Sequence, residues 1–382
     1  MPDLDPVLTG IDALQRSAFH LLREQRIGLI TNHTGLNRHG DATADLLHSA
    51  SGVNLKVLFG PEHGIRGVLD EKVPDGKDER TGLPVYSLYG ERTRPTAEQL
   101  QGLDTLVYDI QDVGTRFYTF SSTLGLCLEE AARHNLRYIV LDRPNPIGGL
   151  DVEGPIADTL SFTAYHPVPI RHGLTVGELA QLYHAEKGLK NELQVVKMEG
   201  WHRSDFWDAV NLTWINPSPN MRSLTQALLY PGIGLLEFTN LSVGRGTDTP
   251  FEIIGAPWME GRKLAAELNA RELPGIRFIP IRFTPKSSIH ANTPCTGVQF
   301  QILCRNRFVP VLTGIAIAET LKRLFPKNWD PGRYDRLLAN KPAYDALLGG
   351  ATAEALVASW QPQVATFRNR RRPHLLYEQD AI

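Results

Sequence analysis

Short apolar runs in the first 142 residues constrain the fold more than any other feature of the chain. They lie at 26–31, 55–59, 103–110 and 138–142, and the stretches between them have helical spacing. Strands that alternate with helices in this way predict right-handed crossovers and a parallel sheet with helices on both faces. We therefore expect an α/β fold in which the carboxyl ends of these strands share one edge.

Polar side chains follow each of the expected strands. They are Asn32 and His33, Glu62 and His63, Asp109 and Asp112, and Asp142 and Asn145. Open α/β sheets bind ligands in the crevice outside the carboxyl ends of their strands. These side chains are distant in sequence, but we expect them to converge at one edge of the sheet.

The turn at 59–67 concentrates several chemically reactive side chains. It reads Phe-Gly-Pro-Glu-His-Gly-Ile-Arg-Gly and places Glu62, His63 and Arg66 between glycines that permit a sharp turn. A nearby cation and a buried apolar wall move a carboxyl pKa in opposite directions, which selects a glutamate as an ionised base or as a proton donor. The alternative is a structural glutamate that accepts backbone amides in its own turn. Glu62 is the first residue to test.

Other candidate residues have structural interpretations of similar weight. Asp112 could cap the next turn or pair with an arginine, and Tyr118 could be a core aromatic residue. In a carbohydrate site, the same tyrosine would stack on a sugar ring while carboxylates bind the sugar hydroxyls. Asn145 lies in a turn that two prolines constrain, and Glu153 could be a surface acid. The cluster fits a carbohydrate without proving one.

A chain of 382 residues exceeds one ordinary hydrophobic core, so we expect two α/β domains, with one large domain as the alternative. The pattern changes near Tyr230, which divides the chain into residues 1–230 and 231–382. Glycines around Arg245 would expose backbone amides beside its guanidinium group. A cleft between the domains would bring a second polar set toward the strand ends. This set contains Glu237, Arg245 and Asp248.

Several helices are expected from the sequence. Reciprocal capping patterns at Thr96–Gln99 and Thr175–Glu178 predict helix starts. Long helices are expected in the second domain at 311–324 and 352–360.

Composition excludes several classes of partner. Forty basic and 42 acidic residues give a net charge of -2, which provides no global field for nucleic acid or an anionic membrane. We interpret the basic run at 368–372 as a solvated or structural feature. The beginning of the chain lacks the features of a signal peptide, and no run reaches about 18 apolar residues. We expect a cytoplasmic protein.

No motif indicates a metal or a nucleotide. The three cysteines lack C-x-x-C spacing, and the chain has neither a P-loop nor G-x-S-x-G. His33, His63, Asp109 and Asp112 could meet around a metal, but no H-E-x-x-H supports such a site. We predict neither a metal nor a cofactor.

Six ordered motifs together resemble the exo-β-N-acetylmuramidase family of the NamZ type. They are Gly-Pro-Glu-His-Gly-Ile-Arg-Gly67, Tyr108-Asp-Ile-Gln-Asp-Val-Gly-Thr-Arg-Phe-Tyr118, Leu141-Asp-Arg-Pro-Asn-Pro146, Val152-Glu-Gly-Pro155, Pro217-Ser-Pro-Asn-Met221 and Ser242-Val-Gly-Arg-Gly-Thr-Asp248. The resemblance implies a glycoside hydrolase that removes terminal N-acetylmuramic acid from the non-reducing end of peptidoglycan fragments. It also implies a Rossmann-like N-terminal domain, a smaller C-terminal domain and an active site between them. Many family members resemble secreted proteins, whereas a cytoplasmic one would act on imported fragments.

The resemblance assigns roles to the candidate residues. Glu62 would be the catalytic acid with His63 beside it, while Asp109, Asp112 or Glu153 would stabilise the oxocarbenium-like centre or position water. The substrate would be a small muropeptide or a disaccharide of N-acetylmuramic acid and N-acetylglucosamine. Its binding residues would be Asn32, Arg66, Arg116, Tyr118, Asn145, Asn220, Glu237, Arg245 and Asp248.

The lactyl carboxylate of muramic acid needs a local cation, for which Arg66, Arg116 and Arg245 are candidates. The 2-acetamido group offers an internal nucleophile. The alternatives are a sugar-binding protein without catalysis and a metal-dependent hydrolase that uses the same cleft.

Overall fold

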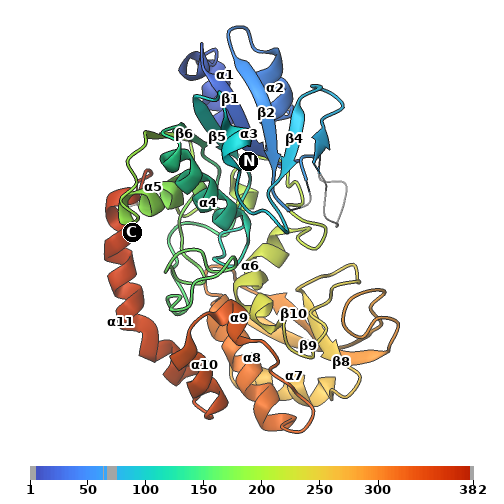
Figure 1. Ribbon diagram of the computed structural model, residues 1–382. Helices are drawn as coiled ribbons and strands as arrows, with labels where there is room; N and C mark the ends of the chain where they lie inside the picture. The colour runs from blue at the N-terminus through green and yellow to red at the C-terminus, as the bar shows by residue number, and fades with distance from the viewer. Residues whose placement is uncertain (1–5, 63, 67–74, 379–382) are drawn as a thin grey trace.

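A computed structural model describes residues 6–62, 64–66 and 75–378, and two sheets organise it (Figure 1). The larger sheet has seven strands in the order β3-β4-β2-β1-β5-β6-β7. Its strands are parallel except for the pair β3 and β4. The strands are β1 (Arg26–Thr31), β2 (Asn54–Gly60), β3 (Gly76–Lys77), β4 (Pro84–Ser87), β5 (Thr105–Asp109), β6 (Arg137–Leu141) and β7 (Leu193–Val196). The predicted mostly parallel sheet is confirmed.

Helices cover both faces of this sheet, as expected for parallel strands that are buried on both sides. Alternate residues of β1 show the two faces: Leu29 packs with residues of α1 and α2, whereas Ile30 packs with residues of α4 and α5. The helices of this part are α1 (Gly10–Arg16), α2 (Thr43–Ser49), α3 (Ala97–Leu100), α4 (Phe120–Arg133) and α5 (Val176–Glu186). The predicted capping boxes at Thr96 and Thr175 are present and begin α3 and α5.

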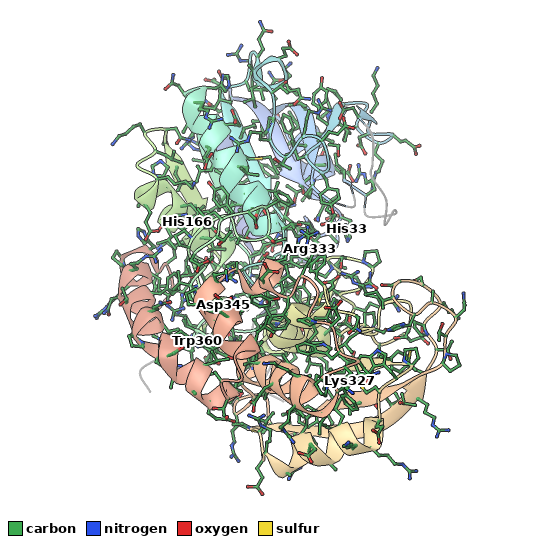
Figure 2. All side chains as sticks on the ribbon, turned by 60° about the horizontal axis from the view of Figure 1, so that its bottom comes forward. His33, His166, Lys327, Arg333, Asp345 and Trp360 are labelled. Carbon is green, nitrogen blue, oxygen red and sulfur yellow. The ribbon has the colours of Figure 1, made fainter. Side chains whose placement is uncertain are left out.

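The register of the parallel strands brings the polar turns to one edge. Ile30 of β1 pairs with Phe59 of β2 on one side and with Tyr108 of β5 on the other. The residues that follow these three positions therefore leave the sheet at the same level. Figure 2 labels His33, which lies at this edge, where the first part of the molecule faces the second.

The second part is built on a smaller antiparallel sheet in the order β8-β10-β9. Its strands are β8 (Ile253–Ala256), β9 (Ile276–Phe283) and β10 (Cys295–Ile302). Its helices are α6 (Leu224–Ile233), α7 (Gly261–Ala270), α8 (Pro310–Leu324), α9 (Asp335–Leu338), α10 (Lys341–Leu348) and α11 (Ala353–Arg371). Short 3-10 turns are η1 (His20–Leu22), η2 (Trp207–Ala209), η3 (Gly234–Leu236) and η4 (Arg372–His374).

Helix α6 connects the two parts. It spans the expected boundary at Tyr230, and the division into residues 1–230 and 231–382 stays a prediction. It packs tightly on α8. A Cβ atom added to Gly314 of α8 would lie only 2.3 Å from the carbonyl oxygen of Gly232 in α6. Glycine is therefore required for this close approach.

Helix α11 is longer than the predicted stretch at 352–360 and returns to the first part of the molecule (Figure 1). Arg370 pairs with Glu186 of α5, with 2.8 Å between Nε and Oε1. Buried Arg371 donates hydrogen bonds to the carbonyl oxygens of His172 and Gly173. The basic run therefore includes two arginines that tie the C-terminal helix to the N-terminal domain. Within the described residues, no helix is both long and apolar enough to span a membrane.

Candidate active site

A pocket lies between the two parts of the molecule, beyond the carboxyl end of β2. It brings together four residues from the predicted site: Glu62, Tyr118, Asn220 and Arg245. Its other described lining residues are Phe117, Thr119, Phe120, Ser218 and Tyr230. A carboxylate, an amide, a guanidinium group and aromatic rings thus face one space, which is the mixture that sugar recognition requires.

Glu62 is held in this pocket by the start of helix α4. It follows the end of β2 by two residues and is half-buried. The hydroxyl of Thr119, the residue before α4, donates a hydrogen bond of 3.0 Å to Oε2 of Glu62. This contact joins segments that are 57 residues apart and fixes one carboxyl oxygen. The other oxygen, Oε1, makes no hydrogen bond with the described residues, so one side of the carboxyl group stays available.

Aromatic side chains form one wall of the pocket. Tyr230 makes edge-to-face contacts with Phe117 and Tyr118, with ring centroids 5.0 and 6.0 Å apart. Burial raises the pKa of the Tyr118 hydroxyl, and nearby Ser218 opposes this shift. Burial also raises the pKa of Tyr230, while the charge of Glu237 adds to the shift. Both phenols are therefore neutral near pH 7 and offer an apolar face with polar tips.

Arg245 brings positive charge to the pocket from the second part of the molecule. Its Nε lies 2.7 Å from Oε1 of Glu237, and its guanidinium group sits 5.3 Å from the ring centroid of Phe251. Burial raises the pKa of Glu237; Arg245 opposes this shift, and the charge of Glu62 adds to it. Glu237 is not among the described residues that line the pocket, but its ion pair orients Arg245, which does line it.

Arg66 has a different place from the one expected. Its guanidinium group donates to Asp78 at 2.8 Å and to Asp45 at 3.0 Å. Hydrogen bonds to Asp78 raise its pKa. Because these carboxylates already neutralise Arg66 and it lies outside the Glu62 pocket, we revise its role to that of a support for the turn.

Arg116 also leaves the predicted binding set. It is buried and donates hydrogen bonds of 2.7 to 3.0 Å to four backbone carbonyl oxygens. The acceptors are Pro155, Val168, Leu337 and Leu338. Burial lowers the pKa of Arg116 to about 9. Its role is to connect the first part of the molecule to the second, so it is not available to a substrate carboxylate.

Asp109 is part of a buried ion pair. Its two carboxylate oxygens accept hydrogen bonds from Nε and Nη2 of Arg143, at 2.5 and 2.9 Å. The hydroxyl of Thr43 donates to the same carboxylate at 2.5 Å. Because this carboxylate is fully buried and saturated, we revise its role from catalytic to structural.

Glu153 and Asn145 are engaged in the same way. Glu153 pairs with Arg171 at 2.7 Å and accepts a hydrogen bond from the backbone amide of Val311. Asn145 donates from Nδ2 to the carbonyl oxygen of Leu174. Neither residue lines the Glu62 pocket, and their contacts explain their positions without a ligand.

Asp112 is buried and lies near enough to Tyr118 to affect the pKa of that hydroxyl. Its Oδ2 accepts a hydrogen bond of 2.9 Å from the amide of Gly114, while Oδ1 has no partner among the described residues. Burial raises the pKa of Asp112 to about 7. Its charge raises the pKa of Tyr118, so the two groups interact although Asp112 does not itself line the pocket.

The remaining predicted residues lie apart from the pocket or outside the described chain. Asn32 is buried, accepts hydrogen bonds from Thr34 and lines a separate depression near Arg66. Asp248 is exposed and does not line the Glu62 pocket. His63 lies outside the described residues. Across the parts of the chain that the structure describes, no three His, Cys, Asp or Glu side chains are grouped to hold a metal ion.

Sequence reasoning did not single out Thr119, Ser218 or Tyr230 as site residues. Ser218 lies within the Pro217–Met221 motif, and Thr119 directly follows the motif that ends at Tyr118. The motifs could therefore have indicated both residues. Tyr230 was used only to mark a domain boundary. Its position at the pocket depends on the packing of α6, which no local pattern predicts.

Comparisons with known proteins show the family to which the chain belongs. Residues 27–225 match the family domain described as "Exo-beta-N-acetylmuramidase NamZ, N-terminal", and residues 228–377 match its C-terminal counterpart. The chain is 41% identical over 378 residues to the peptidoglycan beta-N-acetylmuramidase NamZ of Bacillus subtilis (strain 168). That match covers 97% of this chain and 91% of the relative.

Two crystal structures of DUF1343 family proteins from Bacteroides fragilis NCTC 9343 have the same fold. One is 37% identical with a TM-score of 0.92, and the match covers 99% of this chain and 100% of the other. The second is 29% identical with a TM-score of 0.81, and covers 98% of this chain and 100% of the other. The family domains cover both parts of the molecule. The chain therefore belongs to the exo-β-N-acetylmuramidase NamZ family.

Proposed function

We propose that this chain is an exo-β-N-acetylmuramidase, which releases β-linked N-acetylmuramic acid from the non-reducing end of peptidoglycan fragments. The observation that carries the proposal is the contact of Glu62 with Thr119 in a pocket that Arg245 also lines. A proton donor and a carboxylate-binding cation are the two groups that a muramic acid glycosidase needs. The substrate is a small muropeptide or a disaccharide of N-acetylmuramic acid and N-acetylglucosamine.

In this mechanism, Glu62 gives its proton to the glycosidic oxygen as the bond from that oxygen to C1 breaks. The next sugar then departs as an alcohol. The acetamido oxygen of the muramic acid forms a bond to C1, and water later replaces it while returning a proton to Glu62. This route suits the pocket because Asp109 and Glu153 are bound elsewhere and Glu237 is paired with Arg245.

Recognition of muramic acid falls to Arg245. Its lactyl carboxylate distinguishes this sugar from N-acetylglucosamine, and a guanidinium group binds carboxylates through parallel hydrogen bonds. Arg66 is paired with Asp78 and Asp45, and Arg116 is held by backbone carbonyl oxygens; neither lines the Glu62 pocket. Tyr118 and Tyr230 would provide the ring-stacking wall, and Asn220 would bind a hydroxyl or the acetamido group.

Replacing Glu62 tests the central assignment. We expect Glu62→Gln to lower the release of N-acetylmuramic acid by about 10²- to 10⁴-fold, because the amide cannot donate the carboxyl proton. Release from a disaccharide or a chromogenic muramic acid glycoside is the measurement. Glu98→Gln, at an exposed position in α3, is the matched control. Near-normal turnover in Glu62→Gln would remove Glu62 as the acid.

The acetamido route also predicts the stereochemistry. Two successive displacements at C1 return the original configuration, so the first product should be the β-anomer. NMR spectra recorded early in the reaction distinguish it from the α-anomer before mutarotation mixes them. An α-anomer as first product would require direct attack by water and would contradict the internal nucleophile.

A further inference from the structure

A second cavity lies where the strand order of the large sheet reverses. β2 lies on one side of β1 and β5 on the other, and doubly wound sheets bind ligands in the crevice at such a point. A cavity of about 180 Å³ occupies this crevice. Thr34 lines it after β1, Gln111 after β5 and Arg143 after β6. Among the described residues, this switch-point cavity and the Glu62 pocket have no lining residue in common.

The switch-point cavity favours negative charge. The described residues that line it include Arg38, His39 and Arg143, and none of them carries a carboxylate. Arg143 lines the cavity and is only 5% exposed. Its Nε and Nη2 bind Asp109, and Nη2 also donates to the carbonyl oxygen of Leu36. The ion pair with Asp109 offsets the charge of Arg143, so the net positive charge at the cavity comes from exposed Arg38. Nη1 of Arg143 makes no hydrogen bond with the described residues and remains a donor.

Two further lining residues have unused polar atoms. Oε1 of Gln111 and Nε1 of Trp207 are buried without a hydrogen-bond partner among the described residues. Gln111 is 5% exposed and Trp207 is 8% exposed. An unpaired buried donor or acceptor is costly, so native proteins satisfy such groups with a ligand or an ordered water. Beside these atoms, Leu36, Leu212 and Ile215 add an apolar wall.

We propose that the switch-point cavity binds the carboxylate or phosphate group of a small molecule, with Nη1 of Arg143 and Nε1 of Trp207 as donors. Pockets for drug-sized ligands enclose about 300–1,000 Å³. This cavity is smaller, so its volume suits a small molecule or one end of a longer ligand. The apolar wall contacts the body of the ligand, and Oε1 of Gln111 accepts from a hydroxyl or amide group.

The anionic group has two possible sources. One is a carboxylate-bearing sugar farther along the glycan whose end occupies the Glu62 pocket, and this source rests on the proposed function. Neighbouring strands are about 4.8 Å apart, so the ends of β2 and β5 on either side of β1 are separated by about 10 Å, which a short glycan can bridge. The other source is a separate small anion.

The binding test uses the full chain labelled with 5-fluorotryptophan. Substitution Trp207→Phe assigns the Trp207 resonance, which is then followed during titration with N-acetylmuramic acid, inorganic phosphate and neutral N-acetylglucosamine. We expect the anions to shift this resonance and the neutral sugar to leave it in place. The exposed pair Arg38→Gln and His39→Gln should weaken anion binding by about tenfold, whereas exposed Arg262→Gln should not.

The second test separates the two sources. If the anion belongs to the glycan, the ratio of kcat/KM for a tetrasaccharide to that for a disaccharide should fall in the Arg38→Gln, His39→Gln variant. If it is a separate molecule, this ratio stays constant in the variant, while the wild-type protein still shows the Trp207 shift with phosphate or N-acetylmuramic acid. If the wild-type protein hydrolyses none of the substrates, the proposed function is rejected but the anion site is not. The fluorine signal reports binding and needs no turnover. No anion-dependent shift together with an unchanged ratio would overturn the proposal and leave ordered water as the occupant.

Discussion

The arginines show, at the scale of single residues, how identical side chains take different roles. Arg66, Arg116 and Arg245 were equal candidates for a substrate carboxylate in the sequence. Arg66 is neutralised by aspartates and Arg116 by backbone carbonyl oxygens, whereas Arg245 lines the pocket with Glu62. Asp112 shows the same dependence on surroundings, because burial alone gives it an unusual pKa.

Arg245→Lys should reduce the preference for muramic acid. Lysine keeps the positive charge opposite Glu237 but loses the planar fork that binds a carboxylate through two hydrogen bonds. We expect kcat/KM for a muramic acid glycoside to fall by about 10- to 100-fold. The value for the corresponding glucosamine glycoside, however low, should change little. An equal loss on both substrates would mean that Arg245 does not read the lactyl carboxylate.

At the scale of elements, the stretch from the end of β5 to the start of α4 supports the site and supplies four of the described residues that line the Glu62 pocket. Within this short stretch, Asp109 anchors the strand end, Arg116 connects the domains, and Thr119 holds Glu62. The stretch is almost entirely buried, so its side chains have little freedom. Such rigidity is what positioning of a catalytic carboxyl group requires.

Asp112 in this stretch should make stability depend on pH. Burial raises its pKa from 3.8 to about 7, so the folded state holds the proton more tightly than the unfolded state. Below about pH 4 the carboxyl group is neutral in both the folded and the unfolded state, and the protein has its full stability. This stability is lost as the pH rises from about 4 through about 7, because the unfolded state ionises first. The loss is on the order of 4 kcal/mol, because the shift is about three pKa units.

Asp112→Asn should flatten this dependence, because an amide does not ionise. Urea unfolding of the wild type and the variant at several pH values across this window measures the difference. Parallel curves for the two proteins would show that Asp112 does not cause the decline.

At the scale of the whole molecule, long-range contacts hold the two parts in register. Arg116 reaches carbonyl oxygens of Leu337 and Leu338, and Arg371 at the end of α11 reaches back to Gly173. The Glu62 pocket takes residues from both parts, so its shape depends on these connections. A displacement of one part would separate Arg245 from Glu62.

Arg116→Met should therefore destabilise the protein. The variant leaves buried carbonyl oxygens without donors, and we expect a loss of about 3 kcal/mol or more in the free energy of unfolding. Denaturant unfolding measures this loss, and Arg262→Met, at an exposed position in α7, is the control. Equal stability of the two variants would mean that the buried connection contributes nothing.

The sequence by itself determined the alternation of strands and helices, the capping boxes at Thr96 and Thr175, and the position of Glu62 after a buried strand. These features depend on local periodicity and turn chemistry, which short stretches contain. Tertiary structure alone decided which arginine lines the pocket, that Asp109 and Glu153 are saturated, and that Tyr230 completes the wall. Those outcomes depend on partners many residues away, and on the burial that their contacts create, which no local pattern specifies.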